Sequence, residues 1–390
     1  MRVSIAGASS TKFGKHPESS ARELLTEACL GALEDAGMSP DEIDELRVGN
    51  FMGELTDDQG HMGVMAADYL GTTGVSATRT ESACASSGWA VRNACTALES
   101  GVADVALVAG VEMMHATGIQ RLTDALADAA DNEYENSCGL TFPGIFGLIA
   151  RDYMKEFDVT REQLAEVTVK NRANGVRNPI SQYQEEVTVE EVLEARPIAP
   201  PVSLLDSCPI TDGASAVVLV SPEYADEESI ETSAVVVGSG ASTDTLALQD
   251  RASLSRTHAA ERAVKRAYEH ADVTPDDIDV AEIHDCFTIA EVLAVESLGF
   301  CERGDGARFT AKGETAPDGT IPVNTSGGLI AKGHPVGATG AAQIVELTKQ
   351  LEGTHPTQVE DAETAVAHNV GGSGASTTVH VLEAKSRGGS

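Results

Sequence analysis

The sequence is poor in aromatic residues and has no long apolar run. Aromatic residues make up 4% of its 390 residues and hydrophobic residues 42%, so the core must be packed mainly with Ala, Val and Leu. No apolar run reaches the roughly 18 residues that a membrane-spanning helix needs. Residues 1–7 are typical of a short buried strand and lack the apolar region of a signal peptide. These absences predict a cytoplasmic protein that does not associate with membranes.

Basic residues are also scarce. The chain has 27 Lys and Arg residues against 61 Asp and Glu residues, a net charge of −34. This charge disfavours nucleic-acid binding, because the phosphate backbone attracts cations. Self-repulsion of this size destabilises a compact fold at low salt, and it is screened when the Debye length falls to about 3 Å near 1 M salt. Since the acids are spread along the whole chain, the composition favours a halophilic protein with an acidic, solvated surface.

The cysteine pattern does not indicate a metal site. The seven cysteines form no C-x-x-C pair and no zinc-ligand spacing. An odd number in a cytoplasmic protein predicts free thiols, and most of them should be small buried residues. The length of the chain allows two or three domains.

The chain repeats itself. The pattern at 32–44 returns at 267–279, and the pattern at 88–101 returns at 340–353, followed each time by an apolar strand. Two halves with the same order of helices and strands predict a duplicated α/β unit, with halves at 1–220 and 231–385. Continuous apolar strands such as 216–220 and 234–237 predict a sheet covered by helices on both faces.

One segment of the first half has no counterpart in the second. It spans about 112–203 and contains a predicted helix over 160–174, capped at Thr160. Long insertions are usually functional, so we expect a lid over the active site; the alternative is a passive surface excursion. Residues 386–390 are predicted to form a flexible tail.

A glycine-rich stretch, 324–340, places His334 just before an amphipathic helix predicted for 341–351. On its own this stretch is equally typical of a phosphate-binding loop or a tight turn. The repeat, however, places Cys84 in the corresponding loop of the first half. Pseudo-two-fold symmetry would bring both loops to one central seam, each at a helix N-terminus.

This arrangement suits an activated nucleophile. A helix N-terminus lowers the pKa of a thiol, and a neighbouring imidazole can take its proton. Cys84 could instead be a small core residue, but the polar neighbours Ser82, Ser86 and Ser87 disfavour that alternative. We therefore predict that Cys84 is the nucleophile.

Two more candidate site segments lie directly after predicted strands. His284 and Cys286 follow the apolar strand 280–283, at the end where open α/β sheets bind ligands; by residue type alone, a structural histidine is as good an interpretation. Asn369 and the glycine-rich segment 371–374 also follow a predicted strand. Their backbone N–H groups could form an oxyanion hole, or the segment could be a simple tight turn.

Together these motifs resemble those of the thiolases over essentially the whole chain. The resemblance rests on Ser-Ala-Cys-Ala-Ser-Ser-Gly at 82–88, on the segment 206–216, and above all on Gly-His-Pro-Val-Gly-Ala-Thr-Gly at 333–340. His-Asp-Cys-Phe at 284–287 resembles the sterol-carrier-protein-type and archaeal branch. The resemblance implies an α/β fold of five layers, αβαβα, with two pseudo-symmetric halves and an inserted lid.

The resemblance also implies an activity. A thiolase catalyses the Claisen condensation of acyl-CoAs or the thiolysis of a 3-ketoacyl-CoA through an acyl-enzyme, here on Cys84. It needs no cofactor or metal beyond the coenzyme A thioester. Common thiolases have a second catalytic cysteine where this chain has Asn369, and the branch resemblance implies that Cys286 takes that role. The implied site comprises a catalytic set (Cys84, His284, Cys286, His334), oxyanion N–H groups (Cys84, Gly371) and substrate contacts (Ser326, Gly327).

The family also implies partners. We expect a homodimer or tetramer, and a small OB-fold subunit with a zinc ribbon, which accompanies some archaeal thiolases, is a candidate partner. Lys and Arg are few in the lid, whereas coenzyme A phosphates bind cations. Two alternatives therefore remain, a ketoacyl-synthase-like condensing enzyme and an acyl-CoA-binding subunit that is active only with such a partner.

Overall fold

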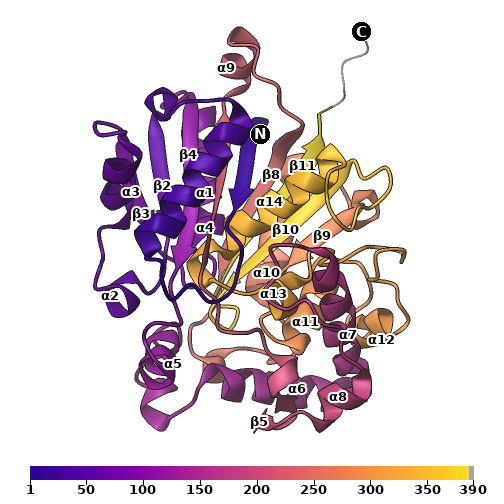
Figure 1. Ribbon diagram of the computed structural model, residues 1–390. Coiled ribbons are helices and arrows are strands. Elements are labelled where there is room, and N and C mark those ends of the chain that lie inside the picture. Colours follow the sequence, from indigo (N-terminus) through magenta and orange to yellow (C-terminus); the bar gives the residue numbers. More distant parts are fainter. Residues whose placement is uncertain (386–390) are drawn as a thin grey trace.

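A nine-stranded sheet runs through the centre of the computed structural model, which describes residues 1–385 (Figure 1). The predicted flexible tail, 386–390, lies outside the described residues. The strands are β1 (Val3–Ser10), β2 (Glu45–Gly49), β3 (Ser76–Thr80), β4 (Val105–Glu112), β7 (Gly213–Val220), β8 (Ala234–Thr243), β9 (Val280–Ile283), β10 (Thr364–Gly371) and β11 (Ser376–Ala384). A separate pair, β5 (Pro197–Ala199) and β6 (Val202–Ser203), forms a two-stranded sheet.

The helices fall into two sets. The main helices of the two halves are α1 (Ala21–Ala36), α2 (Gly53–Thr56), α3 (Met62–Leu70), α4 (Ser86–Glu99), α9 (Pro222–Glu227), α10 (His258–Ala271), α11 (Thr288–Ser297), α12 (Gly306–Ala311), α13 (Gly328–Ala331) and α14 (Thr339–Glu352). The inserted segment carries α5 (Ile119–Ala127), α6 (Phe142–Phe157), α7 (Arg161–Arg177) and α8 (Val189–Glu194).

The sheet is built from two similar sets of strands. Its order is β3-β2-β4-β7-β1-β8-β11-β10-β9. In the first half β2 and β4 are parallel, while β7 is antiparallel to both β4 and β1. In the second half β9 and β10 are parallel, while β11 is antiparallel to both β10 and β8. Because β1 also pairs with β8, the two sets join into one continuous sheet.

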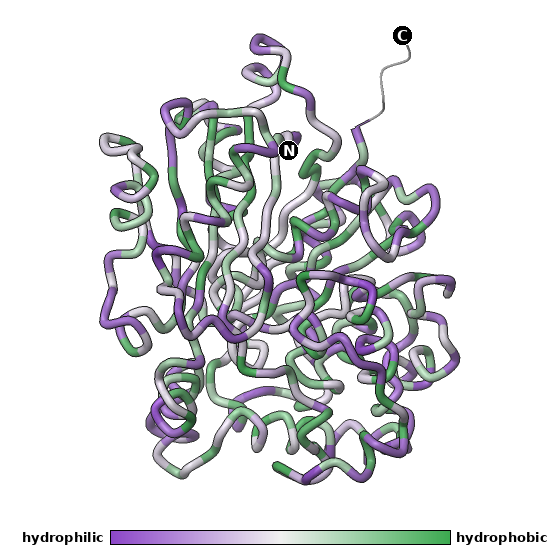
Figure 2. The backbone as a smooth tube through the Cα atoms, in the orientation of Figure 1, coloured by the Kyte–Doolittle hydropathy of each residue, from purple (hydrophilic) through white to green (hydrophobic). Residues whose placement is uncertain are grey.

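Three layers of helices and the two halves of the sheet form five layers, αβαβα, as expected. One outer core packs α1 and α3 on the first half of the sheet, and another packs α10 and α11 on the second half. Between them, apolar residues of α4 and α14 share a central core with both halves. Figure 2 shows the apolar residues concentrated along the strands and inner helices, with hydrophilic residues in the peripheral loops.

The helices of the inserted segment lie along one end of the molecule (Figure 1). Residues of α6 and α7 share an apolar core with α11 and with the loop after β9. Phe146 of α6 stacks on Phe287 of that loop, with 4.5 Å between ring centroids. The insertion therefore packs directly beside the predicted site residues His284 and Cys286.

Several local predictions are confirmed by the structure. Helix α7 begins after Thr160, whose hydroxyl accepts a bond from the N–H of Gln163. Proline starts a short 3₁₀ turn at Pro40 and again at Pro275, as the repeat predicts. Among residues 1–385, no helix is both long and apolar enough to span a membrane.

Candidate active site

Cys84 lies in the tight loop between β3 and α4. Ala83, just before it, adopts a left-handed conformation with φ +48°, which an alanine rarely tolerates unless the surroundings hold it. The hydroxyl of Ser86 accepts a bond from the N–H of Ser82 at 3.0 Å and donates to the carbonyl of Ala83 at 2.6 Å. These bonds hold the thiol in place just before the helix.

The serines beside Cys84 serve a different purpose from the one expected. Ser86 and Ser87 are fully buried, so their polarity does not mark an exposed loop. Ser87 accepts a bond from the N–H of Ala341 at 3.0 Å, which ties α4 to α14 where the two central helices meet. The side chains thus position the nucleophile loop instead of keeping it in solvent.

His334 lies in the corresponding loop of the second half, before α14. Gly333, with φ +118°, gives the backbone a conformation that other residues rarely adopt. The N–H of His334 donates to the hydroxyl of Thr211 at 3.0 Å, and its Nδ1 lies 2.7 Å from the hydroxyl of Thr339. The imidazole is therefore held from both backbone and ring.

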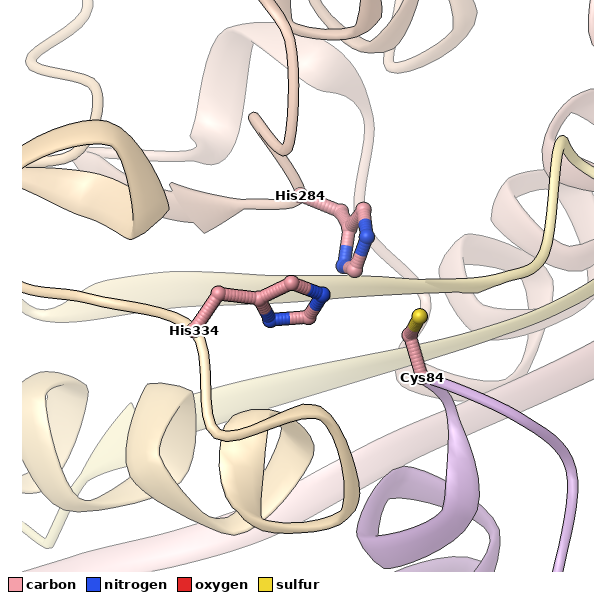
Figure 3. A group of neighbouring side chains, drawn as sticks. All are labelled: Cys84, His284 and His334. Atoms are coloured by element: carbon pink, nitrogen blue, oxygen red, sulfur yellow. The ribbon is translucent and has the colours of Figure 1, made fainter. Parts of the chain in front are cut away.

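The fold brings Cys84, His284 and His334 together (Figure 3). One ligand atom from each, the cysteine Sγ and a ring nitrogen from each histidine, lies within 4.8 Å of the other two. The imidazoles are nearly perpendicular, at 84°, with centroids 5.0 Å apart. Side chains from the ends of three distant segments thus converge on one point, as the repeat predicts for Cys84 and His334.

An apolar cavity of about 160 Å³ opens beside Cys84 and His334, and His284 is not among its lining residues. Cys84, His334 and Cys286 line it together with Phe51, Phe142 and Phe287. A third thiol, that of Cys208, also lines it, and the N–H of Cys208 donates to the carbonyl of Cys286 at 3.0 Å. Cys208 was not predicted as a site residue, although it lies in the thiolase-like segment 206–216.

Of the remaining predicted residues, some lie near Cys84 and others do not line the cavity. Gly372 lines the cavity together with Cys84, and its backbone N–H opposes the increase that burial causes in the pKa of the Cys84 thiol. Gly371 contacts the nucleophile loop, since a Cβ there would meet the carbonyl of Ser82 at 2.5 Å. Ser326 is buried and binds Glu282 through both its N–H and its hydroxyl, at 3.0 and 2.6 Å. Ser326 and Gly327 are not among the residues that line the cavity.

Burial sets the charge state of the site. It raises the pKa of the Cys84 thiol to about 12, and the pKa of Cys286 well above its usual value. It lowers the pKa of His334 to about 3, and that of His284 well below its usual range, with a further contribution from His334 nearby. The resting site therefore contains neutral thiols and neutral imidazoles. A helix N-terminus at Cys84 does not outweigh burial, so the expected lowering of its pKa is wrong for the resting state.

The same three groups are also a ligand set. Two imidazole nitrogens and one thiolate sulfur are donors that zinc prefers, and here they face one point. The cysteine spacing gave no sign of this arrangement, because the ligands come from three distant segments. An assay of this protein should therefore control for zinc.

A network of buried polar groups holds the loop between His284 and Phe287. Asp285 accepts bonds from the N–H groups of Leu329 and Ile330 at 2.6 and 3.2 Å and from the amide of Asn171 at 2.7 Å. Burial raises its pKa to about 7, and the nearby Glu291 contributes to the increase. Glu291 in turn pairs with Lys170 at 2.9 Å. Asp285 thus fixes the turn that carries both His284 and Cys286 against the start of α13.

A second buried network lies behind His334. Lys332 is only 2% exposed, and its Nζ lies 3.8 Å from Glu282 and 3.6 Å from Glu346. Glu346 also meets Nε2 of His355 at 3.0 Å. Lys332 is two residues before His334, and Glu282 is two residues before His284. The ion pair therefore connects the segments that carry the two imidazoles.

Two family models match the chain. The family model of the thiolase N-terminal domain matches residues 3–223, and that of the thiolase C-terminal domain-like family matches residues 240–384. The chain belongs to the thiolase family. It is 45% identical to an acetyl-CoA acetyltransferase of Methanothermobacter thermautotrophicus, over 97% of this chain and 98% of the relative.

Other thiolase relatives confirm the predicted branch. Human sterol carrier protein 2 is 34% identical, over 90% of this chain and 66% of its own length. Among solved structures, an "Ltp2-ChsH2(DUF35) aldolase" is similar with a TM-score of 0.85 and 27% identity, over 99% of this chain and 98% of the other. The resemblance to the sterol-carrier-protein-type and archaeal branch is thus confirmed, as is the thiolase fold.

Proposed function

We propose that this thiolase-family chain is an acetyl-CoA C-acyltransferase that condenses acyl-CoAs, or cleaves 3-ketoacyl-CoA, through an acyl-enzyme on Cys84. The observation that supports this most directly is the convergence of Cys84, His284 and His334 beside an apolar cavity that also contains the thiol of Cys286. The similarity to an acetyl-CoA acetyltransferase supports the same activity.

In the first half-reaction, the Cys84 sulfur attacks the thioester carbonyl of an acyl-CoA while its proton passes to a ring nitrogen of His334. The backbone N–H groups of Cys84 and Gly371 hold the oxyanion of the tetrahedral intermediate. The bond to the coenzyme A sulfur then breaks, and the leaving thiolate takes the proton from His334. Because both groups start neutral, charge separates only during attack.

In the second half-reaction, Cys286 acts as the base for acetyl-CoA. Its proton first passes to His334, and the resulting thiolate removes a proton from the α-carbon. The enolate oxygen is stabilised by His284 and by the protonated His334. The enolate carbon attacks the acyl group, the bond to Cys84 breaks, and the Cys84 sulfur takes the proton back from His334. No metal or redox cofactor enters these steps.

The sequence supports several further proposals. We propose a cytoplasmic, halophilic homodimer or tetramer that acts in lipid metabolism, with halves at 1–220 and 231–385 and a lid at about 112–203. The similar aldolase structure carries a DUF35 component in its name, which supports a partner subunit for this chain too, and we propose a small OB-fold subunit as that partner. Such a partner would supply cations for coenzyme A that an acidic surface with only 27 basic residues lacks.

The decisive test is thiolysis of acetoacetyl-CoA by wild type, Cys84→Ala and Cys286→Ala, near 1 M salt and with EDTA present. Both substitutions should reduce kcat on the order of 10³-fold or more, because each removes a group that forms or breaks a bond. Only Cys84→Ala should abolish the acyl adduct seen by mass spectrometry. An adduct on another residue, or full activity of Cys84→Ala, would refute the assignment. Activity that appears only after a DUF35 partner is added would support the binding-subunit alternative.

A further inference from the structure

Each imidazole of the site has one nitrogen held by a neighbouring side chain. Nδ1 of His334 lies 2.7 Å from the hydroxyl of Thr339, and Nδ1 of His284 lies 3.3 Å from the amide nitrogen of Asn369. Nε2 of His284 is buried and has no hydrogen-bond partner within residues 1–385. A neutral imidazole carries its single proton on one nitrogen or the other. The group that holds Nδ1 therefore decides what Nε2 can do.

Thr339 fixes the proton of His334 on Nδ1. The hydroxyl of Thr339 also lies 3.2 Å from the carbonyl oxygen of Pro335, which can only accept. A hydroxyl has one hydrogen, so when it donates to Pro335 it must accept from His334. This leaves the lone pair on Nε2 of His334, which can then take a proton from a thiol.

Asn369 imposes the opposite arrangement on His284. Its amide nitrogen lies 3.1 Å from the carbonyl oxygen of Cys84, and flipping the amide would place two oxygens against each other. The amide orientation is therefore fixed. An amide NH₂ only donates, so Nδ1 of His284 must be the nitrogen without a proton. The proton lies on Nε2.

The packing around Asn369 leaves its amide little room to move. A Cβ on Gly88 would lie 2.8 Å from its Oδ1, and a Cβ on Gly340 would lie 2.6 Å from it. These glycines stand in α4 and α14, at the point where the two central helices meet. Their missing side chains make the space that the amide occupies.

We propose that Asn369 is a positioning residue that holds His284 as the Nε2–H tautomer, opposite to that of His334. One imidazole can then donate a hydrogen bond to a developing enolate oxygen, while the other accepts a proton from a thiol. This inference rests on the proposed thiolase function and gives a role to the asparagine that stands where common thiolases have a cysteine. A neutral side chain thus makes two similar rings chemically different.

The tautomers can be observed directly by ¹⁵N NMR of protein labelled at histidine, because protonated and bare ring nitrogens have distinct shifts. Difference spectra with His284→Gln and His334→Gln assign the two rings. We expect the proton on Nε2 of His284 and on Nδ1 of His334. Asn369→Leu removes the donor at similar size, and Asn369→Asp replaces it with an acceptor. Both should change the signals of His284 and leave the tautomer of His334 as it was.

Kinetics provide an independent readout. Asn369→Leu and Asn369→Asp should lower kcat for condensation about 10²-fold, the scale of one misplaced oxyanion donor. Acylation of Cys84 by acetyl-CoA should fall less than condensation, because His284 acts in the other half-reaction, although both variants also lose the bond from Asn369 to the carbonyl of Cys84. The control is Thr378→Val, which removes a buried hydroxyl opposite Asn369 in the sheet and should affect neither measurement.

The outcomes separate the two proposals. If Cys84 of the wild type is not acylated, the proposed function fails. If it is acylated but the wild-type rings share one tautomer, or either Asn369 variant leaves the signals of His284 unchanged, the role of Asn369 is wrong. Equal losses in both half-reactions, matched by Thr378→Val and by a lower Tm, would indicate a purely structural residue and also overturn it.

Discussion

The Cys84 loop and the His334 loop occupy corresponding places before α4 and α14, but different forces hold them. Serine hydroxyls and backbone groups hold the first, together with the exposed carboxylate of Glu81, which accepts a bond from the N–H of Ala83 at 2.6 Å. Behind the second lies the buried ion-pair network of Lys332, Glu282 and Glu346. The loop that carries the thiol is thus positioned mainly by hydroxyl and backbone groups, whereas a buried ion-pair network lies behind the loop that carries His334, in addition to the hydroxyls of Thr211 and Thr339.

This difference follows from what each loop must align. Cys84 has only to sit at the start of its own helix. His334 and His284 come from separate segments, before α14 and after β9, and they must face each other. An ion pair between residues two positions before each histidine fixes the segments relative to each other, and low solvent access strengthens that attraction.

Removal of the buried cation should cause the largest loss of stability. Lys332→Met leaves two buried carboxylates without their cation, which should destabilise the protein by about 3–5 kcal/mol. Thermal and urea unfolding at fixed salt measure the change. The matched control is Lys265→Met, which breaks an exposed ion pair with Glu269 and should cost less than about 1 kcal/mol. Similar losses in the two variants would show that the buried pair is no more important than a surface one.

The first half also contains buried carboxyls, and Glu112 is one of them. Glu112 of β4 accepts bonds from the N–H groups of Phe51 and Met52 in its own half, and from Gly337 in the His334 loop, at 2.9 to 3.1 Å. Burial raises its pKa to about 7. Because its carboxylate binds N–H groups of both halves, Glu112 connects the first half directly to the His334 loop.

Glu112→Gln should have an intermediate effect. The amide keeps the shape, but it sets an NH₂ donor against N–H groups that need an acceptor, which should cost about 1–3 kcal/mol. Unfolding at pH 8 measures the loss, with the mostly exposed Glu54 as the matched control in Glu54→Gln. A loss as large as that of Lys332→Met would contradict the view that the two halves are held differently.

The local elements of the fold could be predicted from the sequence, because they depend on local patterns. Apolar runs gave the buried strands, and Thr160 gave the start of α7. The repeat placed Cys84 and His334 in equivalent loops before a helix, which is where they lie. The pairing of β1 with both β7 and β8 could not be predicted, since a pattern of burial does not name the neighbouring strand.

The buried charges escaped prediction for a related reason. Glu282 lies in an apolar strand, and nothing near it in the sequence indicates that its partner is Lys332. Burial of Ser86 and Ser87 escaped too, because a serine satisfied by the backbone can be buried at little cost. The resting pKa of Cys84 was misjudged since burial depends on packing by distant segments. The predictions that were wrong or missing are those that depend on contacts between segments far apart in the chain.

The smallest effect concerns a histidine through which the second half supports the first. His380 of β11 is buried, and its Nε2 lies 3.0 Å from the carbonyl of Gly88 in α4. Burial lowers its pKa to about 4, and Arg92 contributes. In the unfolded chain a histidine titrates near pH 6.5, so between about pH 6.5 and 4 the unfolded state binds one more proton at this site. Stability from this group is therefore complete above that window and is lost as the pH falls through it.

Replacing His380 should flatten that loss without abolishing folding. His380→Gln keeps an N–H donor for Gly88 but cannot titrate, so near pH 5 the slope of unfolding free energy against pH should decrease by about one proton, or about 1.4 kcal/mol per pH unit. Urea unfolding at pH 5, 6 and 7 measures the slopes, and parallel curves for the two proteins would contradict the prediction. A reduced slope with an unchanged stability at pH 7 would show that His380 of the second half supports α4 through a neutral contact.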